Sequence, residues 1–108
     1  MNLPSRKSGL TFRKNFLADT VKSIDPANSP YFGYAEGKTD VRKKGEDFVK
    51  KIEAFHGAYT TQPVVGGNHF SVGRGMDITV QGFGRIKIDQ IMLYEVKDGL
   101  IISEQFFY

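Results

Sequence analysis

The chain has no cysteine among its 108 residues. This absence excludes a disulfide framework, a zinc site built on thiolates, an iron–sulfur cluster and a cysteine nucleophile. Long hydrophobic runs are also missing: the longest is IMLY at residues 91–94, whereas a membrane-spanning helix needs roughly 20 apolar residues. The N-terminus lacks the apolar region of a signal peptide. We therefore expect a soluble, cytoplasmic protein with no membrane partner.

The sequence also lacks a strong excess of either positive or negative charge. The net charge is +3 at pH 7 with a pI near 9.2, a mild excess that falls short of a nucleic-acid footprint. The densest basic stretch is RKK at residues 42–44, and acidic residues interleave it. Asp40 and Lys44, for example, have the i,i+4 spacing of a surface ion pair on a helix. This pattern predicts a solvated helix face and no nucleic-acid partner.

What is present is the composition of a folded domain, 40% hydrophobic and 25% charged. A chain of this length supports one core, so we expect a single domain over residues 1–108, with residues 1–10 as a loose lead-in.

Hydrophobic periodicity predicts two helices in the first half of the chain. Phe12, Phe16 and Leu17 recur at one-turn spacing, which predicts a short helix ending near residues 19–20. A brief strand over residues 21–25 follows, and then a proline-containing loop that leads to the aromatic run YFGY at residues 31–34. The longer helix is expected over residues 40–56, with Thr39 as its N-cap and Gly57 just past its end. Its apolar face comprises Val41, Phe48, Val49, Ile52 and Phe55.

After residue 57 the sequence is typical of an antiparallel sheet, because apolar alternation is interrupted by short turn signals. The four expected strands cover residues 58–65, 69–81, 85–97 and 100–108. The turns are GGN at 66–68, GFG at 82–84 and DG at 98–99.

Both faces of the strand over residues 85–97 carry apolar side chains. Ile91 and Leu93 lie on one face and Met92 and Tyr94 on the other. In the last strand, the same alternation places Ile101 opposite Glu104 and Phe106. Since the predicted helices can cover only one face, we expect the outer face of the sheet to form a homodimer.

Several sequence motifs that could indicate a catalytic or binding site do not match their full patterns. EGKT at residues 36–39 resembles the end of a phosphate-binding loop, but Phe32 occupies the position where that loop needs glycine. His56 and His69 lack metal-ligand spacing and a third ligand, so we expect no metal site and no cofactor. No serine lies in the G-x-S-x-G pattern of an esterase.

The remaining candidates for catalysis are carboxylates in apolar surroundings. Desolvation there can raise the pKa of a carboxyl group and make it a general base. The candidates are Asp25, Asp77 and Asp89. For Asp25 the alternative is that it only starts the turn before proline.

The chain resembles the SnoaL-like branch of the nuclear-transport-factor-two-like superfamily. The resemblance extends over about residues 12–108 and is carried by FLAD at 16–19, EAFHG at 53–57, VGGNHFS at 65–71, YEVKDG at 94–99 and SEQFFY at 103–108.

This resemblance implies an α+β fold, a cone-shaped α+β barrel in which helices close the concave face of a curved antiparallel sheet around an apolar pocket. Here the first helix would be shortened. Enzymes of the superfamily use a pocket carboxylate to move a proton next to a carbonyl, and Asp25 matches the position of that base. The sequence departs from the isomerases at their second acid, where Ile91 stands and Asp89 lies two residues earlier.

Two functions follow. The first is a homodimer that binds a small apolar or aromatic molecule in a pocket. The alternative is an enzyme of the lyase or isomerase type, polyketide cyclase-like or ketosteroid isomerase-like, with Asp25 as base and His69, Asp89 or Tyr31 as its hydrogen-bond partner. A protein-interaction module, as in the transport factor, rests on fold analogy alone. The expected pocket residues are Phe16, Tyr31, Phe48, Ile52, Ile91, Leu93 and Phe106.

Overall fold

The computed structural model describes residues 16–108, which form one helix and a curved seven-stranded sheet. The short helix predicted from Phe12 and the loose lead-in lie outside the described residues, apart from the helix's predicted C-terminal end. The order of the strands across the sheet is β2-β1-β7-β6-β5-β3, with β4 paired to β5. The elements are β1 (Leu17–Ile24), β2 (Ala35–Glu36), α2 (Lys38–Lys51), β3 (Ile52–Thr60), β4 (Val64–Gly66), β5 (His69–Val80), β6 (Gly84–Lys97) and β7 (Leu100–Phe107).

Strand β1 begins earlier than the sequence predicted. Leu17 opens this strand instead of belonging to a helix, and its side chain is only 2% exposed. The backbone of β1 pairs in parallel with β7, with Leu17 opposite Ile101. Pairing with the last strand of the chain is invisible to local periodicity, and it makes the sheet mixed where we expected a purely antiparallel one.

Helix α2 is shorter than predicted at its C-terminal end. It is preceded by Gly37, with φ of 91°, instead of being capped by Thr39. At Ile52 the backbone becomes extended, and β3 pairs antiparallel with β5. Phe55 and Gly57 therefore lie in a strand, and Phe55 is 45% exposed. Hydrogen bonding to a long neighbouring strand outweighs the helical spacing of these apolar residues.

The predicted hairpins match the structure more closely. Gly67, with φ of 57°, lies in the two-residue turn between β4 and β5. Asp98 and Gly99 have φ of 53° and 79° and connect β6 to β7, as expected for a turn that needs two left-handed residues. The strand predicted over residues 58–65 is divided, since residues 61–63 leave the sheet between β3 and β4.

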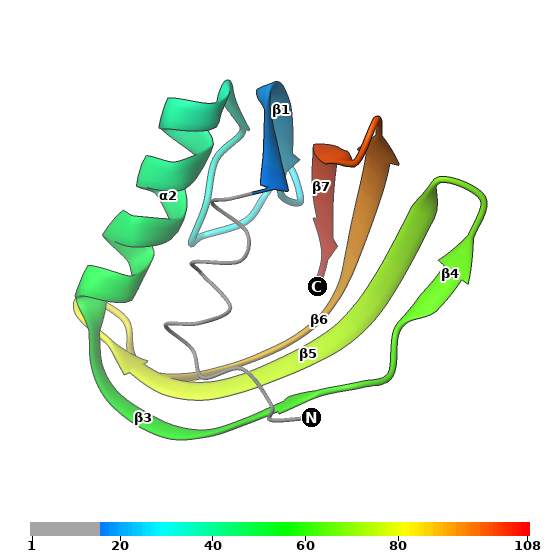
Figure 1. The fold of residues 1–108 in the computed structure, drawn as a ribbon. Coiled ribbons are helices and arrows are strands. Elements are labelled where there is room, and N and C mark those ends of the chain that lie inside the picture. Colours follow the sequence, from blue (N-terminus) through cyan, green and yellow to red (C-terminus); the bar gives the residue numbers. More distant parts are fainter. Residues whose placement is uncertain (1–15) are drawn as a thin grey trace.

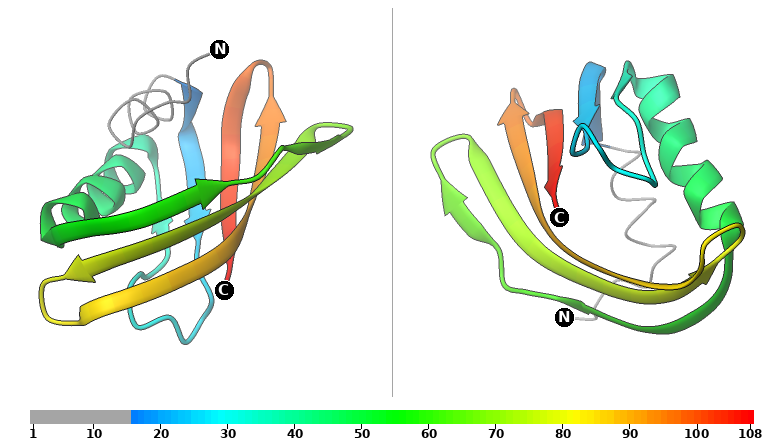
Figure 2. Two further views of the ribbon diagram at one scale, coloured as in Figure 1. Left: turned by 90° about the horizontal axis from the view of Figure 1, so that it is seen from below. Right: turned by 180° about the vertical axis from the view of Figure 1, so that it is seen from behind.

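Strands β5 and β6 are long and strongly bent, so the sheet curls around a concave side while remaining open (Figure 1). Helix α2 closes that concave side, and its N-terminal end lies next to β1, which pairs with β7 (Figure 2). The core centres on this end, where Val41 of α2 packs with Leu17, Val21, Tyr94 and Ile101. Within residues 16–108 the only helix is too short and polar to cross a membrane.

Candidate functional site

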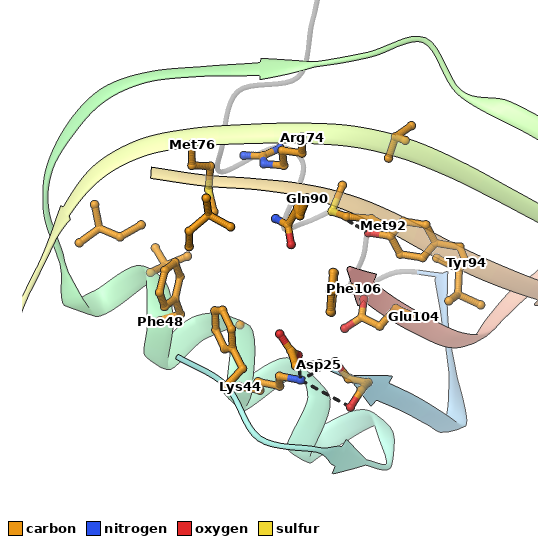
Figure 3. A pocket seen from close by; sticks show the side chains of 18 of the residues that line it. Asp25, Lys44, Phe48, Arg74, Met76, Gln90, Met92, Tyr94, Glu104 and Phe106 are labelled. Atoms are coloured by element: carbon orange, nitrogen blue, oxygen red, sulfur yellow. Dashed lines mark hydrogen bonds and ion pairs between the residues drawn. The ribbon is translucent and has the colours of Figure 1, made fainter. Parts of the chain in front are cut away.

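A cavity of about 420 Å³ lies between α2 and the concave face of the sheet (Figure 3). This volume falls within the range of small-molecule sites. Most of its wall is apolar or aromatic, and only a few charged side chains reach it. The apolar part comprises Phe32, Phe48, Val49, Ile52, Phe70, Val72, Met76, Ile88, Met92, Tyr94, Ile101 and Phe106.

Asp25 is the central polar group of the cavity. It directly follows β1, and its side chain is only 1% exposed. One carboxylate oxygen forms an ion pair with Lys44 of α2. The other accepts a hydrogen bond of 2.6 Å from the hydroxyl of Tyr108, at the end of β7. Both oxygens of this buried carboxylate are therefore satisfied, as a buried charge requires.

Lys44 points into the cavity rather than into solvent, which corrects the predicted solvated face. Its ammonium group donates a 2.9 Å hydrogen bond to Ser23 Oγ as well as bonding Asp25. It also lies 5.7 Å from the ring centres of both Phe32 and Phe106, within range of cation–π attraction. The signal was present in the sequence, because Lys44 falls on the same helix face as Val41 and Phe48.

Glu104 is a second buried carboxylate, 1% exposed, in the cavity wall. It pairs across the sheet with Ser23. The alternation of β7 slips between Ile101 and Ser103, where the register with β6 shifts. This bulge places Ile101 on the same face as Glu104 and Phe106, whereas strict alternation predicted the opposite face.

Among the predicted apolar site residues, the structure brings Phe48, Ile52 and Phe106 into the cavity wall. It places Ile91 and Leu93 on the convex face, since Met92 between them lines the cavity. Those two positions are corrected: they belong to the outer surface of the sheet.

The aromatic residues Phe16 and Tyr31 are absent from the cavity wall. Phe16 is 42% exposed. Tyr31 packs instead against Phe83 and Tyr108, with ring centres 5.2 Å and 6.4 Å apart. Tyr31 therefore supports the loop beside Tyr108 and makes no hydrogen bond to Asp25.

The other polar candidates lie away from Asp25. His69, at the start of β5, lies 3.9 Å from the carboxylate of Glu95. Asp89 lies on the outer face, where it accepts a 2.7 Å hydrogen bond from Tyr59. Neither residue lines the cavity. The hydrogen-bond partners of Asp25 are instead Lys44 and Tyr108.

Asp77 also faces outward. Its carboxylate accepts two hydrogen bonds from the guanidinium group of Arg85, at 3.0 Å and 2.9 Å. These bonds lower the pKa of Asp77 below its ordinary value. Asp77 is therefore an ionised surface group outside the cavity wall.

The pKa of Tyr108 is raised above its ordinary value of 10.0. Burial is the main cause, and the hydrogen bond to Asp25 adds to it, because both disfavour the phenolate. Ser29 acts in the opposite direction. Its Oγ lies 2.5 Å from the Tyr108 hydroxyl and also accepts hydrogen bonds from the amides of Tyr31 and Phe32. The hydroxyl of Ser29 therefore donates to Tyr108, which in turn donates to Asp25.

No group of three histidine, aspartate or glutamate side chains suited to a metal ion occurs within residues 16–108. Among the described residues, the charged side chains that line the cavity are two carboxylates, one ammonium group and the guanidinium group of Arg74. Such a set can orient a ligand or move a proton.

A profile of the SnoaL-like domain matches residues 4–108, nearly the whole sequence. The chain belongs to the SnoaL-like domain family. The resemblance to this branch of the nuclear-transport-factor-two-like superfamily is thereby confirmed, and the expected α+β fold is confirmed with an open, curved sheet. No curated protein matches the sequence with significance.

Solved structures of SnoaL-like and related proteins superpose on this chain. A proposed SnoaL-like polyketide cyclase from Mesorhizobium loti has 28% identity and a TM-score of 0.85, covering 95% of this chain and 87% of its own. A ketosteroid isomerase-like protein from Catenulispora acidiphila, solved with trimethylamine, has 17% identity and a TM-score of 0.71, covering 88% and 71%. A nuclear-transport-factor-two-like protein from Burkholderia pseudomallei has 15% identity and a TM-score of 0.75, covering 94% and 79%. The last two similarities show the fold alone.

Proposed function

We propose that this SnoaL-like protein binds a small apolar or aromatic molecule in the cavity between α2 and the sheet. The observation that carries the proposal is the cavity itself, about 420 Å³ of mostly apolar wall with buried charged groups. Burial of an apolar ligand in such a site is favourable by roughly 25 cal/mol per Å² of surface removed from water. The few polar groups would orient the ligand.

A neutral aromatic probe of suitable size tests this function. We expect 2-acetylnaphthalene to bind the full chain with one-to-one stoichiometry in titration calorimetry. Val72→Trp should abolish binding, because Val72 lines the cavity and an indole ring would fill it. The matched control is Val64→Trp, since Val64 is exposed and lies outside the cavity wall. Equal binding by both variants would locate the ligand elsewhere and contradict the proposal.

A second candidate function is proton transfer of the lyase or isomerase type. It is favoured by Asp25, a carboxylate in the cavity wall with fixed hydrogen-bond partners. In this reaction Asp25 would remove a proton from a carbon next to a carbonyl group. Lys44 would stabilise the negative charge that develops on the carbonyl oxygen.

The same probe tests this chemistry, because its acetyl group carries protons next to a carbonyl. In D₂O, we expect the protein to accelerate deuterium exchange at the acetyl methyl group of the probe relative to buffer. The exchange is measured by NMR. Asp25→Asn should remove the acceleration. If the probe binds and exchanges no faster than in buffer, the protein is a binder and Asp25 is a positioning group for the ligand.

The outer face of the sheet is the proposed homodimer interface. Ile91 and Phe107 are neighbours across β6 and β7, and they are 50% and 48% exposed. Tyr59 covers Gly75 on the same face, where a Cβ atom would come within 2.0 Å of its ring. An apolar patch of this kind on a single-layer sheet favours burial against a second copy of the chain.

A further inference from the structure

The sheet side of the cavity contains a second polar site, formed by Arg74 of β5 and Gln90 of β6. These residues are directly opposite one another in the antiparallel register. Their side chains therefore leave the sheet on the same face, a few ångströms apart. Figure 3 shows both across the cavity from Asp25 and Glu104.

Apolar rows flank this polar pair on both sides. The neighbouring cross-strand pairs are Val72 with Met92 and Met76 with Ile88, and all four residues line the cavity. A guanidinium group in such surroundings loses part of its hydration. Within residues 16–108, the side chain of Arg74 makes no hydrogen bond or ion pair.

The described residues contribute three other charged groups to the cavity wall. Lys44 and Asp25 are paired with one another, and Glu104 lies in the row next to Ser23 at the β1 and β7 end. In the part of the chain that the structure describes, Arg74 is thus the cationic group of the cavity wall that is available to a ligand. A planar guanidinium group presents parallel N–H donors that match both oxygens of a carboxylate. The amide of Gln90 adds a further N–H donor beside it.

We infer that Arg74 and Gln90 form a carboxylate-binding subsite, so that the natural ligand is an apolar or aromatic carboxylic acid. This inference rests on the proposed binding function and names its ligand class. The carboxylate would lie against the sheet, and the apolar body would extend over Met92 and Phe106 toward Asp25 and Lys44. An arrangement with polar contacts at both ends would fix the orientation of the ligand.

The test compares 2-naphthoate with its neutral amide, 2-naphthamide, by titration calorimetry with the full chain. A charge-assisted hydrogen-bond pair is expected to favour the carboxylate about tenfold or more. Arg74→Gln should remove this preference, because it weakens the binding of 2-naphthoate about tenfold more than the binding of 2-naphthamide. The matched control Arg85→Gln, on the outer face, should retain the preference.

Gln90→Glu provides a second variant with an intact guanidinium group. Its carboxylate would pair with Arg74 across the strands and compete with the ligand. We expect the binding of 2-naphthoate to weaken much more than the binding of 2-naphthamide, because the new carboxylate repels only the charged probe.

Equal affinity of the wild-type chain for the two probes would overturn the inference, as would a preference that survives Arg74→Gln. If neither naphthoate nor naphthamide binds while 2-acetylnaphthalene does, the subsite is refuted and the apolar cavity function stands. If none of the three probes binds, the proposed function itself fails, and the subsite with it.

Discussion

The hydroxyl of Tyr108 donates a 2.6 Å hydrogen bond to Asp25, a residue 83 positions earlier in the sequence. The contact joins the end of β7 to the loop after β1, two strands that pair in parallel. Lys44 approaches the same carboxylate from α2. Three elements distant in sequence thus converge on one buried charge, which positions the polar end of the cavity.

The Asp25–Lys44 ion pair should be strongly coupled. Asp25→Asn leaves a largely buried ammonium group without its counter-ion, and breaking such a pair costs about 3 kcal/mol in the free energy of unfolding. Replacing both partners, as Asp25→Asn with Lys44→Met, should restore most of that loss, because no uncompensated charge remains. Urea denaturation of the two single variants and the double variant measures the coupling. Additive losses would show that the two groups do not interact.

The pKa of Tyr108 should respond in opposite directions to its two partners. Asp25→Asn removes a carboxylate that disfavours the phenolate, so the pKa should fall; Ser29→Ala removes a hydroxyl donor, so it should rise further. The ¹³Cζ shift of labelled tyrosine, followed against pH, reports both changes. A shift in the same direction for both variants would contradict the assigned direction of the hydrogen bonds.

The raised pKa of Tyr108 also makes stability depend on pH. The folded state favours the neutral phenol, so this contribution is complete below the ordinary value of 10.0 and is lost as pH rises through the raised folded value. In Tyr108→Phe, we expect the free energy of unfolding to decline less steeply above pH 10 than in the wild type. Parallel declines in the two proteins would exclude Tyr108 as the cause.

The ring of Tyr59 packs so closely over residue 75 that only glycine fits there without displacing the ring. A Cβ atom at residue 75 would lie 2.0 Å from the ring, so Gly75→Ala must displace Tyr59 from Asp89. The pKa of Tyr59, raised mainly by that hydrogen bond, should return toward its ordinary value. Overpacking of this kind costs about 1 kcal/mol or more in the free energy of unfolding. Gly57→Ala is the control, because nothing lies within 4 Å of its added Cβ atom.

A charge on the convex face should dissociate the proposed homodimer. Ile91→Asp buries a carboxylate in that interface without a partner, so the variant should sediment as a monomer at micromolar concentration while the wild type sediments as a dimer. Phe83→Asp, in the turn after β5, is an exposed control and should remain dimeric. A monomeric wild type would refute the interface.

Much of this fold could be predicted where local chemistry decides the backbone. Asp98 and Gly99 form a tight turn because both adopt positive φ. The sequence places Asp25 between a strand and an aromatic loop, and in the structure this acid lines the cavity. The family resemblance supplied the curved sheet and the cavity behind it.

The remaining features depend on contacts between distant segments. Ile52 and Phe55 have helical spacing, but both lie in β3, whose backbone pairs with β5. The bulge before Ser103 shifts the side chains of β7, so Ile101 joins Glu104 on the cavity face. The i,i+4 spacing of Lys44 with Asp40 predicts an ion pair on a solvent-exposed helix face. The true partner of Lys44, Asp25, lies across the fold.

Methyl NMR on β6 tests the central claim most directly, because Ile88 and Ile91 lie on opposite faces of one strand. With ¹³C-labelled isoleucine and methionine methyl groups, titration with 2-acetylnaphthalene should shift the signals of Ile88 and Met92 and leave Ile91 unchanged. Shifts at Ile91 without shifts at Ile88, or no shift at all at saturating probe, would contradict ligand binding in the cavity.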